Sequence, residues 1–331
     1  MHKVYIDGSV GTTGLQIVER LAGRADIQLL DIAEEYRKDI NARLEKINQA
    51  DVAILCLPDE ASREIVAAVD AAGIDTTIID ASSAHRTADG WVYGMPELSP
   101  EQRESIRTAK RITNPGCHAS GFIAVVAPLV KSGVLSPDFP AVCFSLTGYS
   151  GGGKGMIAEY ESNKGNPDYA MRQYALGQSH KHLPEMTKWS GLTKAPVFCP
   201  VIGDFEMGMI TSVPIHGGQF EGTHTRADIH GILTEHYNQL PPSLRDTPLG
   251  EEGNHPGTSC HLALQGNIHL LPLDSDNIIA ANALAGQDDM LISVDGNDER
   301  IVLTARFDNL GKGASGAAVQ CLGIVLGSLE G

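Results

Sequence analysis

The first part of the chain alternates apolar runs with amphipathic segments. Residues 3–8 (KVYIDG) form an apolar run typical of a buried strand. A glycine-rich turn follows, and residues 15–24 then place Leu15, Val18 and Leu21 on one face of a helix, because apolar residues spaced three or four apart share a helical face. The opening of the chain therefore predicts a strand, a turn and a helix in succession.

The same alternation continues to about residue 82. Further strands are predicted at 27–32, 51–57 and 76–82, and helices at 34–47 and 61–72. Strands that alternate with helices form a parallel, doubly wound, Rossmann-like α/β sheet, whose ligands bind beyond the carboxyl ends of the strands. The turn sequences GSVGTTG, CLPDEAS and DASSAHR follow three of these strands, so we expect them at the ligand-binding edge.

The pattern changes after residue 118. Segments 144–150, 207–217, 277–284 and 290–296 are typical of strands separated by turns that contain glycine and proline. They predict a second domain of the α+β type, built on a mixed sheet.

The closing segment, residues 313–329, is too apolar to stand alone and predicts a helix that packs back onto the first domain. A chain of 331 residues is long enough for two domains. We expect a dinucleotide-binding domain formed by 1–116 together with 310–331. The intervening residues, 117–309, are expected to form a catalytic and substrate domain that also makes the oligomer contacts.

Composition and charge exclude several classes of protein. The formal net charge of −16, with no concentrated basic patch, argues against a nucleic-acid partner. No run approaches the roughly 20 apolar residues that span a bilayer, and no signal-peptide core precedes the first strand, so we expect a cytoplasmic protein without a membrane partner. Six cysteines without a CxxC pair predict free thiols and no metal site.

The first turn carries a glycine pattern suited to a dinucleotide. Gly8, Gly11 and Gly14 lie between a strand and a helix, where bare backbone lets a pyrophosphate approach the amides at the positive end of the helix. Thr12 and Thr13 add hydroxyl donors. The alternative is a tight structural turn, since glycine-rich turns also occur without nucleotides.

The end of the second strand bears on the choice between NAD and NADP. Asp31 suits a free ribose diol, whereas Arg37 and Lys38 suit a 2′-phosphate. Two adjacent cations favour NADP, and the alternative is that they form the solvated start of a helix.

Cys117 differs from the other cysteines in its setting. Pro115 and Gly116 form a turn before it, and an apolar helical run follows it, so Cys117 is predicted at a helix N-terminus. There the helix dipole and free amides favour the thiolate and lower the pKa of the thiol. We therefore predict a nucleophile at this position; the alternative is a buried capping cysteine.

Two further clusters carry polar groups suited to catalysis. His180 and His182, followed by Glu185, could be metal ligands, a proton-transfer group with an orienting carboxylate, or surface residues. A histidine that titrates near neutrality best suits proton transfer. Ser82, Ser83 and Arg86 follow a strand and could hold a phosphate at the rim of the cleft, or form a turn with a capping serine.

The glycine turn and the NPGC sequence around Cys117 resemble the semialdehyde dehydrogenase family. The segments DASSAHR, YGMPEL, SGGGKG, HKHLPE and DNLGKGASGAAVQ have close counterparts, in the same order, in its N-acetyl-γ-glutamyl-phosphate reductases of the shorter sequence type. These motifs span nearly the whole chain. One departure is local: the family cysteine is usually followed by Tyr-Pro-Thr, where this chain has His118, Ala119 and Ser120.

The resemblance implies NADPH-dependent reduction of N-acetylglutamyl 5-phosphate to the 5-semialdehyde and phosphate, through a thioester on Cys117, in arginine biosynthesis. It implies that His182, with His180 close behind, is the acid-base group, that Glu185 orients it, and that Arg86 with Asn114 holds the acyl phosphate. It places Ser150, Gly151 and Gly152 beside NADP, and it has Asn309 bind the nicotinamide carboxamide. It also implies a homodimer or homotetramer.

Related activities remain as alternatives. Aspartate-semialdehyde dehydrogenase and the reductase that acts on carrier-bound aminoadipyl phosphate share this chemistry and differ in the substrate pocket. NPGC and HKHLPE favour the N-acetylglutamyl enzymes. A dinucleotide sensor without catalysis would need no Cys117, histidine pair or Arg86, and all of these are present.

Overall fold

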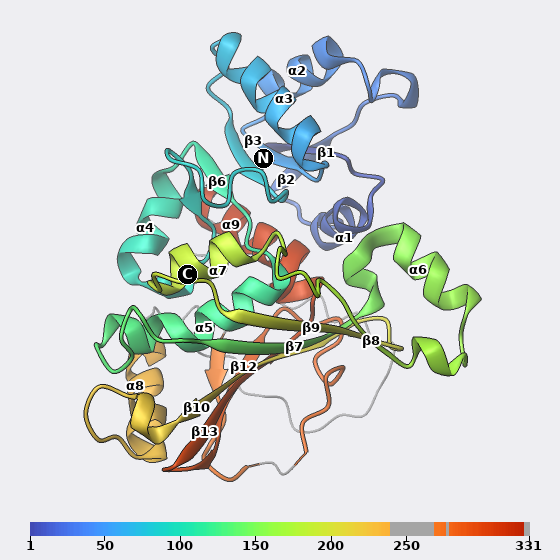
Figure 1. The fold of residues 1–331 in the computed structure, drawn as a ribbon. Helices are drawn as coiled ribbons and strands as arrows, with labels where there is room; N and C mark the ends of the chain where they lie inside the picture. The colour runs from blue at the N-terminus through green and yellow to red at the C-terminus, as the bar shows by residue number, and fades with distance from the viewer. Residues whose placement is uncertain (239–267, 276–277, 328–331) are drawn as a thin grey trace.

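The computed structural model describes residues 1–238, 268–275 and 278–327, and these form two domains, each built on one sheet (Figure 1). The first sheet has six strands in the order β2-β1-β3-β4-β6-β5, and every pair in it is parallel. This confirms the predicted doubly wound sheet. Its strands are β1 (His2–Asp7), β2 (Ile27–Leu30), β3 (Val52–Leu55), β4 (Thr77–Asp80), β5 (Val92–Tyr93) and β6 (Arg111–Thr113).

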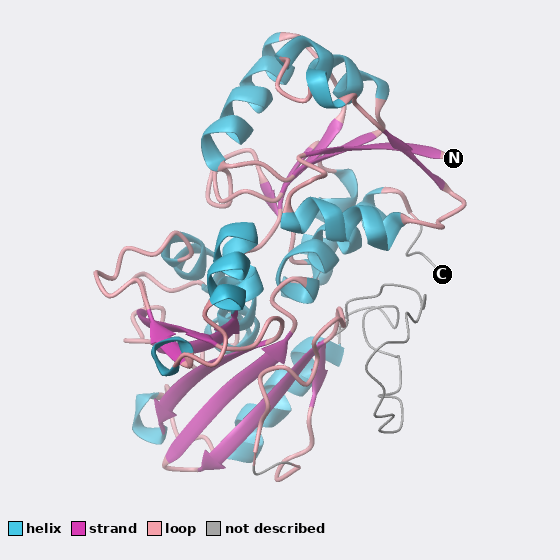
Figure 2. Ribbon diagram, turned by 90° about the vertical axis from the view of Figure 1, so that its right-hand side faces the viewer, coloured by secondary structure: helices cyan, strands magenta, loops and turns pink. Residues whose placement is uncertain are grey.

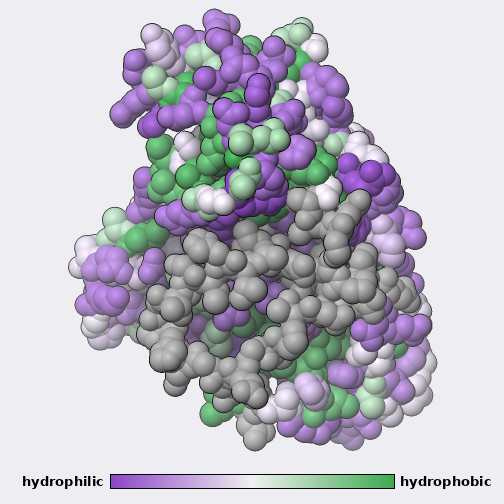
Figure 3. Space-filling view, turned by 180° about the vertical axis from the view of Figure 1, so that it is seen from behind, coloured by the Kyte–Doolittle hydropathy of each residue, from purple (hydrophilic) through white to green (hydrophobic). Residues whose placement is uncertain are grey.

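Helices cover both faces of the first sheet, so β3 and β4 are buried along their whole length. These helices are α1 (Thr12–Leu21), α2 (Ile40–Gln49), α3 (Asp59–Ala71) and α4 (Pro100–Thr108). The far end of this domain, where α2 and α3 lie, is mostly hydrophilic at its surface (Figure 3).

One expected helix of the first domain is wrong in its extent. Residues 34–47 do not form a single helix: a short 3₁₀ turn (Glu34–Tyr36) ends first, and α2 begins only after Asp39. The Asp39 carboxylate accepts hydrogen bonds from the backbone N–H groups of Asn41 and Ala42. Such an N-cap starts a new helix and so separates it from the preceding turn.

The end of the described chain returns to the first domain, as predicted. A π-helical turn (Gly311–Ser315) leads into α9 (Gly316–Val325). Ala318, Leu322 and Ile324 of α9 lie in one apolar core with residues of β1 and α1. Because this helix is buried almost all round, it completes the first domain although it is last in the sequence.

The second sheet has seven strands in the order β11-β12-β13-β10-β7-β9-β8 and is mixed. The β7–β9 and β11–β12 pairs are parallel and the others are antiparallel. The strands are β7 (Val142–Gly148), β8 (Met171–Gln173), β9 (Val197–Gly203), β10 (Met209–His216), β11 (Ile268–Leu270), β12 (Met290–Asn297) and β13 (Arg300–Phe307).

Two helices, α5 (Cys117–Lys131) and α8 (Arg226–Asn238), share one core with this sheet (Figures 1 and 2). Helix α6 (Gly153–Ser162) extends away from the sheet beside α1, and α7 (Leu183–Ser190) packs on α5. The mixed sheet confirms the predicted class of the second domain. Its boundaries at 116/117 and 309/310 stay a prediction.

Three of the four expected strands in this domain are confirmed, as β7, β10 and β12. The fourth, 277–284, is wrong in its described part, since residues 278–284 form coil and turns; Asn277 lies outside the described residues. The buried residues here, Ala281 and Leu284, are three positions apart, and Ile278 is 86% exposed. This spacing differs from the two-residue alternation of buried and exposed side chains in a strand. Strands β9 and β13 were not singled out from the sequence.

The five cysteines within the described residues are free thiols, and Cys260 lies outside them. None of the helices in the described part of the chain is long and apolar enough to cross a bilayer.

Candidate active site

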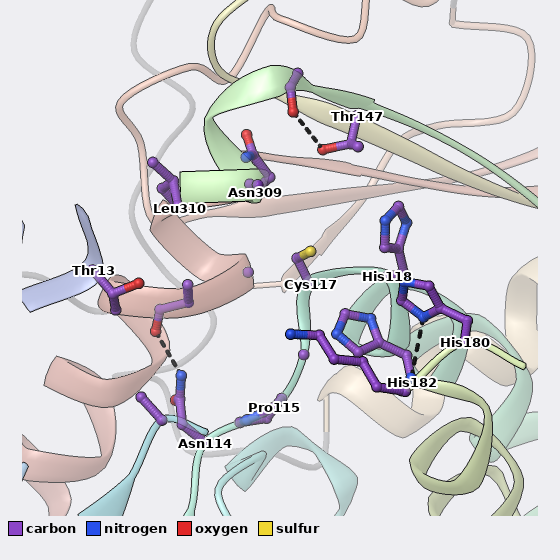
Figure 4. Close-up of a pocket in the computed structure, with 18 of the residues that line it drawn as sticks. Thr13, Asn114, Pro115, Cys117, His118, Thr147, His180, His182, Asn309 and Leu310 are labelled. Carbon is purple, nitrogen blue, oxygen red and sulfur yellow. Dashed lines mark hydrogen bonds between the residues drawn. The ribbon is translucent and has the colours of Figure 1, made fainter. Parts of the chain in front are cut away.

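A pocket lies where the two domains meet, and loops from both contribute to it (Figure 4). The first domain supplies Thr13 of α1 and residues that follow β4 and β6. The second domain supplies the start of α5, the loop after β7, and the segment from Tyr174 to His182. The π-helical turn closes the remaining side. The carboxyl edge of the parallel sheet therefore faces the pocket, as doubly wound folds require.

Cys117 is the first residue of α5 and lines this pocket, as the sequence predicted. Gly116 is the N-cap, in an extended conformation. The π-helical turn packs directly against the cysteine: a Cβ added to Gly313 would lie 2.8 Å from Cβ of Cys117. Only a glycine at position 313 lets the turn approach the nucleophile this closely.

A buried carboxylate organises the groups around Cys117. Glu185 is 1% exposed and accepts hydrogen bonds from Nη1 of Arg86 at 2.7 Å, the Tyr93 hydroxyl at 2.9 Å and the backbone N–H of Gly116 at 3.1 Å. Burial, with the charge of Glu185, raises the pKa of Tyr93 well above its ordinary value, so Tyr93 remains an O–H donor. The carboxylate thus ties the turn before the nucleophile to α7 and to the strand of Tyr93.

Gly116 is the point at which these groups converge. A Cβ built there would lie 2.4 Å from Nη1 of Arg86, 2.5 Å from Oε1 of Glu185 and 2.5 Å from Nε2 of His182. No side chain fits in that space. This explains the glycine in the proline-glycine turn, and it puts the ring of His182 beside the backbone that presents Cys117.

The two histidines differ in their free nitrogens. Nδ1 of His180 accepts the backbone N–H of His182 at 3.1 Å, so its ring proton is on Nε2. Nδ1 of His182 is buried and has no hydrogen-bond partner among the described residues. Figure 4 shows both rings in the same pocket as Cys117. His182 therefore offers an unpaired nitrogen to a proton, whereas the Nδ1 lone pair of His180 is already in use.

Glu185 does not orient His182 through a short hydrogen bond. Its Oε1 is 3.9 Å from Nε2 of His182, which is within ion-pair range and beyond hydrogen-bond range. Its strong contacts go to Arg86, Tyr93 and Gly116. The carboxylate therefore orients the surroundings of the imidazole more than the imidazole itself.

Burial sets the protonation states in the pocket. Burial, followed by the charge of Arg86, lowers the pKa of His182 well below its ordinary value, and burial lowers the pKa of His180 to about 4. Burial also raises the pKa of Cys117, and the Arg86 guanidinium and the N–H of His118 offset this only in part. This corrects the sequence-based expectation of a lowered thiol pKa. The pocket therefore holds a thiol beside neutral imidazoles.

His118, where this chain departs from the family pattern, is a structural link. Its Nδ1 bonds the Ser145 hydroxyl and its Nε2 bonds the Tyr174 hydroxyl, each at 2.7 Å. Burial lowers the pKa of His118 to about 3, so the ring is neutral. It connects the first turn of α5 with β7 and with the loop that carries Tyr174.

The expected phosphate-holding residues are brought together only in part. Arg86 and Asn114 line the pocket, but Ser82 and Ser83 do not. The Ser82 hydroxyl donates to Asp80 at 2.7 Å and the Ser83 hydroxyl donates to Asp59 at 2.6 Å. Both serines are therefore engaged by carboxylates of their own domain, and the role predicted for them is not supported.

The first glycine loop fits a dinucleotide. Gly8 has φ +85°, and a Cβ there would lie 2.4 Å from the carbonyl oxygen of Cys56. A Cβ on Gly14 would lie 2.3 Å from the carbonyl oxygen of Gly8. The loop is thus folded tightly onto the N-terminus of α1, where backbone amides can bind a pyrophosphate. Thr13 lines the pocket, whereas Thr12 faces the second glycine loop, 3.9 Å from a Cβ built on Gly153.

Asn309 connects that second loop with the end of the chain. Its Nδ2 donates to the Ser150 hydroxyl at 3.0 Å and its Oδ1 accepts the backbone N–H of Gly208 at 2.8 Å. Gly151, Gly152 and Asn309 all line the pocket, and Nδ2 of Asn309 keeps one hydrogen for a ligand. This arrangement fits the predicted contact with a nicotinamide carboxamide.

Arg37 and Lys38 lie beyond the first 3₁₀ turn and do not line the catalytic pocket. Their predicted contact with a 2′-phosphate stays a prediction. Within the described residues, no cluster of histidine, cysteine, aspartate and glutamate is arranged to hold a metal ion.

Two family models match the chain. The semialdehyde dehydrogenase NAD-binding domain matches residues 3–106, and the semialdehyde dehydrogenase dimerisation domain matches residues 117–243. Among similar proteins, an N-acetyl-gamma-glutamyl-phosphate reductase 2 of Nostoc sp. is 42% identical and covers 99% of this chain and 98% of its own. A protein of the same name from Pseudomonas putida is 42% identical, covering 99% and 97%.

This chain is an N-acetyl-γ-glutamyl-phosphate reductase family member. It is an oxidoreductase with an NAD(P)-binding domain of the semialdehyde dehydrogenase type.

Solved structures share its fold at low sequence identity. Aspartate semialdehyde dehydrogenase II of Vibrio cholerae has a TM-score of 0.69 at 16% identity and covers 98% of each chain. The Candida albicans aspartate semialdehyde dehydrogenase with NADP has a TM-score of 0.61 at 15% identity, covering 100% and 99%.

Gly116→Ala tests the convergence at the N-cap. The added methyl group must displace Arg86, Glu185 or His182, so we expect kcat to fall by about a hundredfold or more, which corresponds to roughly 2.7 kcal/mol. Dinucleotide affinity, measured by fluorescence titration, should be unchanged. Gly231→Ala is the control, because a Cβ there meets nothing within 4 Å. Full activity in Gly116→Ala would contradict the described geometry.

The protonation states predict how Cys117 responds to pH. The rate of alkylation by iodoacetamide should rise steadily from about pH 6 to about pH 9, because the thiolate is the reactive form and burial raises the pKa of the thiol. Peptide mass spectrometry identifies the modified cysteine, and Cys117→Ser provides the blank. A rate that is already constant between about pH 6 and 8 would mean that the helix amides and Arg86 outweigh burial.

Proposed function

We propose that this enzyme reduces N-acetylglutamyl 5-phosphate to N-acetylglutamate 5-semialdehyde with release of phosphate, in arginine biosynthesis. One observation carries the proposal: Cys117 at the start of α5 shares a pocket with the unpaired Nδ1 of His182 and with both glycine loops. The relatives at about 42% identity over nearly the whole chain bear the name of this activity.

In the first half-reaction, His182 takes the proton of the Cys117 thiol. The sulfur then attacks the acyl carbon, a carbon–sulfur bond forms, the bond to the bridging oxygen breaks, and phosphate leaves. The free backbone amides in the first turn of α5 face the oxyanion that develops. A base is needed because burial raises the pKa of Cys117, and the neutral ring of His182 can accept the proton. The anionic acyl phosphate would stabilise the resulting imidazolium, which offsets the lowered pKa of that ring.

A dinucleotide held by the two glycine loops would supply the hydride that reduces the carbonyl carbon of the thioester. The carbon–sulfur bond then breaks, the aldehyde leaves, and His182 returns its proton to the sulfur. With a dinucleotide bound, the remaining amide hydrogen of Asn309 would hold the nicotinamide end, and the π-helical turn packs against Cys117 on its side of the pocket. Each half-reaction thus uses the same sulfur and the same imidazole, which end in their starting protonation states, and the released phosphate takes from the solvent the one proton that the overall reaction consumes.

The alternatives are less well supported. The similarity to aspartate semialdehyde dehydrogenases is 14–18% in sequence among the compared structures, so it bears on the fold alone. A sensor without catalysis does not account for a thiol, two neutral imidazoles and a buried Arg86–Glu185 pair in one pocket.

The decisive assay follows NADP reduction with N-acetylglutamate semialdehyde and phosphate, beside aspartate semialdehyde. We expect turnover with the acetylated aldehyde and little with the other. In this assay His182→Asn should lower kcat by about 10²–10⁴, the usual contribution of a general acid-base group, because it removes the free nitrogen. His180→Asn should cost less than about tenfold, because Nδ1 of His180 already accepts a backbone hydrogen bond.

Cys117→Ala serves as the inactive control and should still bind the dinucleotide. No signal with the acetylated aldehyde would remove the proposed substrate. A greater loss in His180→Asn than in His182→Asn would exchange the roles of the two histidines.

We propose NADP as the preferred cofactor. Arg37 and Lys38 follow the second strand of the sheet, where two cations can neutralise a 2′-phosphate. The expected result is a higher kcat/KM for NADPH than for NADH, and Arg37→Ala with Lys38→Ala should narrow that ratio by raising KM for NADPH alone. A preference for NADH in the wild-type enzyme would assign the site at Asp31 to a free ribose diol instead.

We propose that the enzyme is a homo-oligomer assembled through the second domain, whose family model is named for dimerisation. Val142 and Phe144 of β7 and Val197 of β9 are 38%, 41% and 56% exposed and share the sheet face opposite Cys143 and Phe198, which are buried in the core. Phe144→Glu is expected to lower the mass measured by light scattering, because it places a charge in that apolar contact. An equal charge at Ile278, which is 86% exposed, is the control. An unchanged mass for Phe144→Glu would move the interface elsewhere.

A further inference from the structure

The pocket contains a cation that the reaction above does not use. Lys181 lies between His180 and His182 in the sequence. It lines the pocket and is an exposed residue. Its ammonium group makes no hydrogen bond and no ion pair with the described residues. It was not singled out from the sequence, because a lysine between two histidines resembles an ordinary solvated residue.

Arg86 is the other lysine or arginine among the described residues that line the pocket, and its donors are largely committed. Its Nε donates to the carbonyl oxygen of Asn114 at 2.9 Å, Nη1 donates to Glu185 at 2.7 Å, and Nη2 donates to the carbonyl oxygen of Ala81 at 3.4 Å. Glu185 also balances its charge. Arg86 therefore leaves the pocket without a net positive charge of its own.

An acyl phosphate needs such a charge. It carries about two negative charges, and the chain has a formal net charge of −16. A positively charged side chain is therefore needed where the phosphoryl group binds, to offset the repulsion between the protein and the substrate. An ammonium on a flexible stem is a common phosphate ligand.

Lys181 is placed at the reacting end of the pocket. Its charge contributes to the lowering of the pKa of Cys117, and of the pKa of His180 and His182 as well. It also helps to lower the pKa of Asp59, at the start of α3. Lys181 and Cys117 line the same pocket, to which the first domain also contributes, so the ammonium group shares the space in which the acyl phosphate would react.

We propose that Nζ of Lys181 binds the phosphoryl group of the substrate and stabilises the phosphate as it leaves. As the sulfur–carbon bond forms, the bridging oxygen takes the electron pair of the breaking carbon–oxygen bond, and the added negative charge faces the ammonium. Lys181 keeps its proton throughout, so it acts by charge alone. In this arrangement Arg86 is a fixed part of the wall and Lys181 is the ligand that meets the anion. The inference deepens the proposed function and rests on it.

The first test runs the reaction from the aldehyde, with inorganic phosphate as the varied substrate. Lys181→Met should raise KM for phosphate about tenfold or more and leave KM for the semialdehyde within about twofold, and Lys181→Arg should restore most of the loss. Lys194→Met removes the same charge from an exposed site outside the pocket and should behave as wild type. A raised KM for the semialdehyde with an unchanged KM for phosphate would assign Lys181 to the substrate carboxylate and overturn the proposal.

A second test does not depend on turnover. An ammonium near Cys117 should favour the anionic reagent iodoacetate over neutral iodoacetamide, so Lys181→Met should lower the ratio of the two alkylation rates about tenfold. Inorganic phosphate should slow alkylation by iodoacetate in the wild type and not in Lys181→Met. An unchanged ratio and equal protection would overturn the proposal.

The two tests separate the two claims. If phosphate protects Cys117 through Lys181 but the acetylated aldehyde is not turned over, the substrate assignment fails and the phosphate site stands. If turnover occurs and Lys181→Met retains the wild-type KM for phosphate, the phosphate site fails and the proposed function stands.

Discussion

The site depends on one buried carboxylate. Glu185 is almost fully buried, so its charge requires partners inside the protein, and these are the Arg86 guanidinium, the Tyr93 hydroxyl and the N–H of Gly116. These partners come from three separate segments of the chain. Satisfying the carboxylate therefore fixes the turn that presents Cys117, and it does so without a hydrogen bond to His182.

The π-helical turn holds the two domains together at the same place. Its Gly313 packs on Cys117, and the carbonyl oxygen of Ala314 accepts a hydrogen bond from Asn114 at 2.9 Å. Ser315 donates to Gln16 of α1 at 2.9 Å, and Lys312 is buried in an ion pair with Glu97. A wide turn of this kind, often found at functional sites, brings four segments into contact over a few residues.

Burial and charge have different effects in the pocket: burial sets the protonation states, and the charged side chains set the local electrostatic potential. Burial lowers the pKa of the imidazoles and raises the pKa of the thiol, so the proposed mechanism forms the nucleophile by proton transfer within the pocket. Arg86 is neutralised by Glu185, whereas Lys181 has no ion-pair partner within the part of the chain that the structure describes. The pocket thus keeps a fixed ion pair for structure and a separate cation that can respond to an anionic ligand.

The sequence alone determined what depends on local pattern. Alternating apolar runs predicted the parallel sheet, the glycine spacing predicted the tight turn before α1, and the proline-glycine turn predicted Cys117 at a helix N-terminus. The tertiary structure decided everything that depends on a partner distant in sequence. It showed that Asp80 and Asp59 occupy the hydroxyls of Ser82 and Ser83, that His182 keeps a free nitrogen, and that burial raises the pKa of Cys117. A hydrogen bond or a desolvation cost arises only when the folded chain brings groups together, so local patterns can predict where a residue lies but not which of its atoms remain free.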